Sequence, residues 1–225
     1  MRSHKHFLSL LMVVAAVAVS LAAYPRLPER MPVHWGPSGH ADRFGSRATG
    51  SMMLPAAMLA IWLFLTFAPR FDMLLFLRYD ARRRDDTTAQ RAYDGMVAVV
   101  LMVLLVIHTV TIGIATGIIS GSYEPTLIAC VVSLGAIAIG NYTPRITHRN
   151  AFIGFRVPSA YTSEEAWRRT QRAAGYGMVL AGIIGLAGAI ASPASPLKPF
   201  FSAMAVQMVV VAVYSYVIAR NTSLS

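Results

Sequence analysis

Six stretches without Asp, Glu, Lys or Arg divide the chain and constrain its fold more than any other feature. They cover residues 7–25, 48–69, 95–123, 125–144, 173–197 and 199–219. A helix of about 20 predominantly apolar residues crosses the hydrocarbon core of a bilayer, and each stretch is long enough to do so. Hydrophobic residues make up 56% of the chain and charged residues 13%, outside the usual range for water-soluble domains. The sequence therefore predicts an all-α, multi-pass membrane protein with six transmembrane helices.

The first stretch could instead belong to a cleaved signal peptide, since Arg2 and Lys5 precede an apolar run. We favour a retained helix. The run exceeds the roughly 7–15 residues of a signal-peptide core. Tyr24 also supplies the aromatic side chain that is common where a span meets the membrane interface.

Glycines at short spacings predict close helix packing. Gly113, Gly117 and Gly121 are four apart, and Gly182, Gly185 and Gly188 are three apart. Small residues let helix backbones approach closely. We interpret these glycines as packing contacts within the chain rather than a dimer seam, although Gly117 and Gly121 also offer a place for the overlong 95–123 stretch to end.

The distribution of Lys and Arg predicts how the protein is oriented. Fifteen of the 20 lie in the N-terminus, the 70–94 and 145–172 segments and the C-terminus, and five lie in the 26–47 segment and at position 198. Because Lys- and Arg-rich loops stay on the cytoplasmic side, we expect both termini in the cytoplasm of a cell (inner) membrane. The net charge of +10 then reflects topology and attraction to anionic headgroups of the lipid bilayer. We expect no direct binding of nucleic acid.

His108 is the one ionisable residue deep within an expected span. Such residues are costly in lipid, so His108 could serve a proton relay or contact a ligand. Pairing with a Ser, a Thr or a backbone carbonyl of a neighbouring helix is an equally good interpretation. No acidic residue lies at membrane depth, which argues against a proton-coupled pump.

The segment from 24 to 47 is rich in Pro and Gly, which disfavours a helix and predicts a rigid chain of turns. Its side chains suited to binding, with the glycine between them, are His34, Trp35, Gly39, His40 and Asp42. His34, His40 and Asp42 could in principle ligate zinc, but their spacing matches no strong metal motif. Cys130 is the only cysteine, so no thiolate metal site forms either. We therefore predict a hydrogen-bonded lid with no metal and no cofactor.

The segment from 70 to 94 predicts a helix that leaves the membrane and lies along its inner face, with arginines toward headgroups. We expect headgroup contact there rather than a specific partner site.

The segment from 140 to 172 has an irregular first part and a helical second part. Pro144 and Pro158 bracket the first, in which Asn150, Gly154 and Arg156 suit turns and a fixed guanidinium. Such a guanidinium either ties the loop to a carboxylate or carbonyl, or binds a carboxylate or phosphate ligand.

In the second part, Ser163 is an expected N-cap and Trp167 an expected interfacial anchor. Glu164 and Glu165 each precede an arginine by four residues, at positions 168 and 169, a spacing that favours ion pairs.

This segment resembles the SdpI family of bacterial membrane proteins. The matching positions are Gly140, Asn141, Pro144, Asn150, Gly154, Arg156, Pro158, Glu164, Glu165, Trp167, Arg168, Thr170 and Arg172. The 24–47 segment resembles a domain of unknown function that often precedes the SdpI module. The chain departs from the family at Ser159 and Ala160, where a Trp-Thr pair is common, and at Gln171, where a His is common.

The resemblance implies three parts: residues 1–69, two spans joined by an extracytoplasmic loop at 24–50; residues 70–94, a basic cytoplasmic loop; and residues 95–225, an SdpI-like four-helix module with a cytoplasmic loop at 142–174. It implies an immunity and signal-transduction protein, not an enzyme, that protects against a secreted membrane-active peptide toxin and holds a transcriptional repressor at the membrane. We hypothesise that His34, Trp35 and Asp42 meet the toxin. The cytoplasmic motif residues would have partner or structural roles.

Two other functions are considered. A small permease would need a polar pathway, in which His108 is the natural participant. A metal-dependent membrane enzyme would need the His34, His40 and Asp42 cluster to bind metal.

Overall fold

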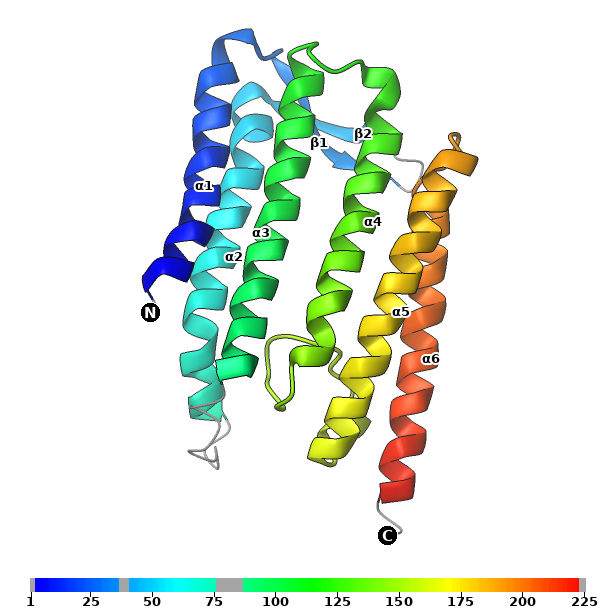
Figure 1. Ribbon diagram of the computed structural model, residues 1–225. Coiled ribbons are helices and arrows are strands. Elements are labelled where there is room, and N and C mark those ends of the chain that lie inside the picture. The colour runs from blue at the N-terminus through cyan, green and yellow to red at the C-terminus, as the bar shows by residue number, and fades with distance from the viewer. Residues whose placement is uncertain (1–2, 37–40, 76–86, 223–225) are drawn as a thin grey trace.

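The computed structural model places long helices side by side in an up-and-down bundle (Figure 1). The structure describes residues 3–36, 41–75 and 87–222. The helices are α1 (Ser3–Ala23), α2 (Arg47–Leu75), α3 (Thr87–Ala115), α4 (Glu124–Tyr142), α5 (Glu164–Ala191) and α6 (Lys198–Thr222). Within these described residues six helices are long and apolar enough to cross a membrane, which confirms the predicted all-α, multi-pass class.

Successive helices alternate in direction, so their connections gather at two ends (Figure 1). We call one the basic end; it carries both chain termini and the loop at 143–163. The other, the hairpin end, carries the strands β1 (Arg30–Trp35) and β2 (Ala41–Ser46) and the turns before α4 and α6. That the basic end faces the cytoplasm remains a prediction from the Lys and Arg distribution.

The Pro- and Gly-rich segment is a β-hairpin rather than a chain of turns. β1 and β2 pair antiparallel from Arg30↔Ser46 to Trp35↔Ala41, with irregular register on either side of His34. Pro32 is tolerated because a two-stranded sheet has only edge strands, whose outer N–H groups need no partner strand. Met31 is fully buried, and a Cβ added to Gly50 of α2 would lie 2.4 Å from the Met31 Cβ. Burial of Met31 against the helix ends thus holds an extended conformation that local composition does not predict.

The charge-free stretch at 95–123 is helical only in its first part and ends in a turn that contains its glycines. α3 stops at Ala115, and Gly117 has a φ of +76°, a left-handed conformation that favours glycine. Gly117 and Gly121 therefore belong to the turn, and the prediction that they continue a helix-packing face is wrong. A short 3-10 turn, η3 (Gly121–Tyr123), leads into α4.

The glycines of α5 do pack within the chain, as predicted. A Cβ at Gly182 would lie 2.6 Å from the Ser133 carbonyl oxygen of α4. At Gly188 it would lie 2.3 Å from Pro199 of α6. Glycine at these positions lets α4, α5 and α6 approach closely.

Two helices near the basic end extend beyond the charge-free stretches of the sequence. Residues 70–75 continue α2 instead of turning along the membrane face, because the run from Phe71 to Leu75 contains no Gly or Pro to end a helix. The remaining part of that prediction, at 76–86, lies outside the described residues. The helix that begins after Ser163 and the fifth charge-free stretch form one continuous helix, α5, which ends at Ala191.

Candidate functional site

The hairpin is attached to the bundle at specific points. The Trp35 indole N–H donates to Glu124 Oε1 at 2.6 Å, and Glu124 is the first residue of α4. At the hairpin base, the Arg47 backbone N–H donates to the Glu29 carbonyl at 2.9 Å. Together with the buried Met31, these contacts fix the hairpin over the ends of α1, α2 and α3 and against α4.

His34 and Asp42 form an exposed pair across the hairpin. Their Nδ1 and Oδ1 atoms are 2.6 Å apart, and the side chains are 46% and 49% exposed. The hydrogen bond from His34 holds the pKa of Asp42 below its ordinary value. Phe44 lies two residues beyond Asp42 on the same strand face and is 52% exposed. We call His34, Asp42 and Phe44 the hairpin surface.

Of the five side chains and glycines singled out in this loop, Gly39 and His40 lie outside the described residues. The metal interpretation needs His40. Among the residues that are described, no three His, Cys, Asp or Glu side chains come together as a metal site. Trp35 differs from the sequence-based expectation, since its polar atom is used to attach the hairpin.

His108 joins three helices. Its Nε2 lies 2.9 Å from Ser20 Oγ and 3.2 Å from the Ala16 carbonyl, both on α1. Ser20 Oγ in turn donates to the Ser51 carbonyl of α2 at 2.6 Å. Ser20 and His108 are both fully buried. These contacts fit the interpretation of His108 as a residue paired with a neighbouring Ser and backbone carbonyl.

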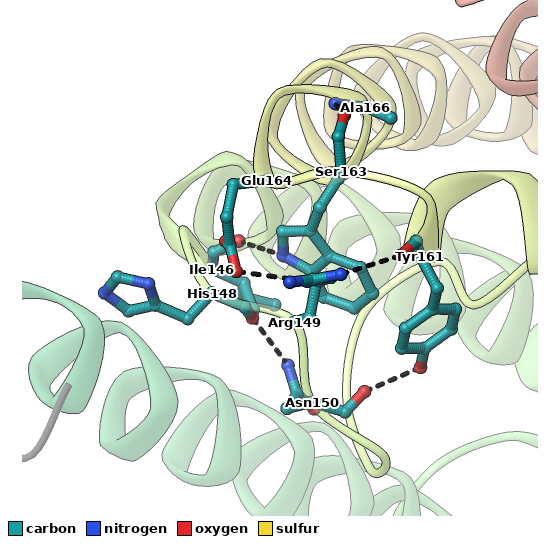
Figure 2. Close-up of polar contacts among 9 residues, drawn as sticks. Ile146, His148, Arg149, Asn150, Tyr161, Ser163, Glu164 and Ala166 are labelled. Carbon is teal, nitrogen blue, oxygen red and sulfur yellow. Dashed lines mark hydrogen bonds and ion pairs between the residues drawn. The ribbon is translucent and has the colours of Figure 1, made fainter. Parts of the chain in front are cut away.

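At the basic end, the side chain of Asn150 makes three hydrogen bonds to the backbone of the loop. Its Oδ1 accepts from the backbone N–H groups of Phe152 and Ile153 at 3.0 and 2.8 Å, and its Nδ2 donates to the His148 carbonyl. The Tyr161 hydroxyl donates to the Asn150 carbonyl at 2.7 Å, which closes the loop on itself (Figure 2). The asparagine amide therefore replaces the backbone partners that an irregular segment lacks.

Ser163 caps α5 as predicted, because its Oγ accepts from the Ala166 N–H at 3.0 Å. Glu165 pairs with Arg169 as predicted, and also with Arg168. Glu164 does not pair with Arg168; it accepts from Arg149 Nε at 3.0 Å (Figure 2).

Arg149 was missed by sequence reasoning although it ties both parts of the loop together. Besides Glu164 it reaches the Tyr161 carbonyl, to which Nη1 donates at 2.8 Å (Figure 2). No short-range spacing rule relates positions 149 and 164, so only the folded loop brings them together.

Trp167 is fully buried, and the prediction of an interfacial anchor is wrong. Its indole N–H donates to the Ile146 carbonyl at 2.8 Å, and its ring centroid lies 5.2 Å from that of Tyr161. The loop folds back over the first turn of α5 and covers the indole, which therefore packs against protein instead of headgroups. Its burial forms one apolar cluster with Ile146, Ala160 and Met96 of α3.

Gln171 clamps the loop from α5. Its Oε1 accepts from the Phe155 N–H at 2.8 Å and its Nε2 donates to the Phe155 carbonyl at 2.9 Å. Gly154 has a φ of +94°, and a Cβ there would lie 2.4 Å from Gln171 Oε1. Gly154 is therefore required both by its backbone conformation and by the close approach of Gln171.

Most of the remaining motif residues make contacts within the protein. Arg156 Nη1 donates to the Ala151 carbonyl, a tie within the loop. A Cβ at Gly175 would lie 2.6 Å from Pro144 Cδ, so Pro144 packs on α5. Pro158 begins the 3-10 turn η5 (Pro158–Tyr161), Asn141 Nδ2 donates to the Ile137 carbonyl at 3.0 Å, and Arg172 is exposed.

The loop also joins the two halves of the bundle. The ring of Phe152 lies edge-on to Phe64 of α2, with centroids 5.5 Å apart. On the other side, Ser159 Oγ is 2.8 Å from Ser215 Oγ of α6, which Thr170 Oγ1 also contacts at 3.0 Å. A change in any of these helices would therefore reach the loop directly.

Comparisons with known proteins match two separate segments of the chain to two families. Residues 11–59, which include most of α1, the hairpin and part of α2, match the family described as Domain of unknown function (DUF1648). Residues 147–219, which include most of the basic-end loop, α5 and most of α6, match the SdpI/YfhL protein family. The chain is thus a multi-pass cell-membrane protein in which a DUF1648 segment precedes an SdpI segment, and the predicted resemblance is confirmed.

A particular relative is the protein named Immunity protein SdpI from Bacillus subtilis (strain 168). It is 25% identical over 183 residues, which cover 80% of this chain and 79% of the relative. No solved structure matches the chain. The similarity supports a membrane immunity function.

Proposed function

We propose that the protein gives immunity against a secreted, membrane-active peptide toxin. The observation that carries the proposal is the similarity to the Bacillus immunity protein over 80% of this chain and 79% of the relative. The proposal assigns no catalytic reaction to the protein.

The hairpin surface is the proposed point of toxin contact. His34, Asp42 and Phe44 are about half exposed and combine a hydrogen-bonding pair with an apolar ring. Such a surface suits a peptide that is itself both polar and apolar. Trp35 is assigned a different role from that expected from sequence: it holds the hairpin on α4 through Glu124, so that the surface is presented in one orientation.

The basic end is the proposed site for a cytoplasmic repressor. Arg168, Arg169 and Arg172 are exposed on the first turns of α5, and Glu165 compensates only part of their charge. The loop beneath them contacts α2 and α6, so a movement of the bundle after toxin binding would change this surface. An acidic face on the repressor would complement it.

A protection assay tests the toxin half of the proposal. A sensitive bacterium expressing the chain is challenged with culture supernatant of a strain that secretes a membrane-active peptide, and survival is compared with the empty host. The full chain should protect. His34→Ala with Asp42→Ala should lower protection at equal membrane abundance, while Ser122→Ala, an exposed change at the same end, should leave it unchanged.

Trp35→Phe tests the attachment of the hairpin to α4 separately from toxin contact, because it keeps an aromatic ring and removes the hydrogen bond to Glu124. We expect reduced protection that is partly restored at lower temperature, where the hairpin stays docked. Full protection by the His34→Ala and Asp42→Ala double variant would refute the proposed contact surface. Failure of the unaltered chain to protect against any such supernatant would count against immunity itself.

A further inference from the structure

Several exposed arginines at the basic end make no ion pair among the described residues, and two of them flank the junction of α3 and α4. Arg149, Arg168 and Arg169 are paired with glutamates. Arg91, near the start of α3, and Arg145, just after α4, are exposed and make no ion pair among the residues that the structure describes. Unpaired cations at the edge of a membrane-spanning bundle are suited to anionic ligands.

The two arginines lie on either side of a close contact between α3 and α4. A Cβ added to Gly95 would lie 2.3 Å from Cε1 of Tyr142, so the Tyr142 ring lies directly against α3 at Gly95. Arg91 precedes Gly95 by four residues and therefore emerges from the same helix face, one turn nearer the basic end. The guanidinium of Arg145 lies over the Tyr142 ring, 5.2 Å from its centroid.

Both arginines lie where phospholipid headgroups begin. The apolar span of α3 starts at Tyr93, and the span that contains α4 ends at Arg145. The start of α3 and the end of α4 also lie at the same level in the bundle (Figure 1). The apolar stems of arginines at this depth stay along the protein while their charged ends reach the headgroup layer.

We propose that Arg91, Tyr142 and Arg145 form a binding site for the phosphate of an anionic phospholipid at the α3–α4 junction. Each guanidinium donates hydrogen bonds to phosphate oxygens, a geometry that guanidinium groups match well. Tyr142 holds Arg145 in position through its ring. A lipid with a net negative charge is preferred over a zwitterionic one, because the ammonium of the latter is repelled by the same arginines. The site does not depend on the immunity proposal.

Native mass spectrometry of the full chain tests the site, with phosphatidylglycerol and phosphatidylcholine offered in equal amounts. We expect phosphatidylglycerol to be retained preferentially. Each of Arg91→Gln and Arg145→Gln should lower that preference about fivefold, the effect expected for one basic residue near anionic lipid. Arg168→Gln is the matched control: it removes the same charge at the same end, but from a side chain already paired with Glu165.

Thermal unfolding in phosphatidylcholine alone is measured for every variant, to check that each one is folded. The variants Arg91→Lys and Arg145→Lys keep the positive charge and should retain most of the lipid preference. Three results would overturn the site: no preference in the unaltered chain, an equal loss with Arg168→Gln, or full preference in the Arg91→Gln and Arg145→Gln double variant. A final arm offers inorganic phosphate alone. Stabilisation by inorganic phosphate equal to that by phosphatidylglycerol would assign the arginines to a soluble anion and overturn the lipid proposal.

Discussion

The substitution Gly154→Ala, which adds one methyl group, is expected to destabilise the basic-end loop strongly. Gly154 has a φ of +94°, and its missing Cβ position lies 2.4 Å from Gln171 Oε1. The added methyl group therefore forces both an unfavourable backbone conformation and a displacement of the Gln171 amide. That amide makes two hydrogen bonds to the backbone of Phe155.

The magnitude follows from these two effects. A non-glycine residue held in a sparsely populated backbone region costs about 1–3 kcal/mol. Each of the two hydrogen bonds that Gln171 would lose contributes about 0.5–1.5 kcal/mol. We therefore expect the free energy of unfolding to fall by about 2–6 kcal/mol. Gly121→Ala is the control, because a Cβ there meets nothing within 4 Å and φ is not positive; its effect should stay within about 0.5 kcal/mol.

Unfolding in mixed detergent micelles, followed by tryptophan fluorescence, measures these differences. Gln171→Ala alone should also destabilise, since it leaves the Phe155 backbone groups without their partner. Each single variant loses the two hydrogen bonds of Gln171, but the double variant loses them only once. The losses in the two single variants should therefore add up to about 1–3 kcal/mol more than the loss in the double variant. A Gly154→Ala protein as stable as the unaltered chain, or strictly additive effects, would refute the proposed clamp.

Three further predictions concern other parts of the molecule. Trp167→Phe, which removes the buried indole N–H, should lower the free energy of unfolding by about 1–3 kcal/mol, measured in the same micelle assay; an unchanged value would contradict its role. Ser20→Ala should cost about 1–2 kcal/mol, because interhelical hydrogen bonds in membranes are individually modest, and a loss above about 4 kcal/mol would contradict this. Because the pKa of Asp42 is lowered in the fold, its stabilising contact with His34 is fully present above the ordinary carboxyl pKa and is lost as the pH falls through the lower folded value. Hydrogen exchange should therefore show the hairpin losing protection in the unaltered chain, but not in Asp42→Asn, as the pH falls from about 5 to about 3; an equal loss of protection in both proteins would disprove the contact.

The basic-end motif illustrates how far sequence reasoning reaches. Residues with strong local preferences were placed correctly: Ser163 caps α5, and Glu165 pairs with Arg169 four residues further on. These roles depend on neighbours within four residues, where helix geometry alone decides which atoms meet. Whether Arg156 ties the loop or binds a ligand could not be decided in this way, because the carbonyl of Ala151 becomes its partner only when the loop is folded.

Residues whose partners are distant in the chain were predicted less well. Trp167 has the amphipathic character of an interfacial anchor, yet the fold places the Ile146 carbonyl beside its indole nitrogen. Gln171 was noted only as a departure from the family, although it clamps Phe155.

By itself the sequence determined that this protein lies in a membrane and has six helices that can cross it, because the length of an apolar stretch and the charges beside it are properties of the chain that do not depend on how the helices pack. The tertiary structure alone decided that the Pro-rich segment is a hairpin, that Trp35 attaches it to Glu124, and that the basic-end loop joins α2 to α6. The physical reason is that these features depend on which buried surface and which unpaired polar group each segment meets, and only the packed helices supply those partners.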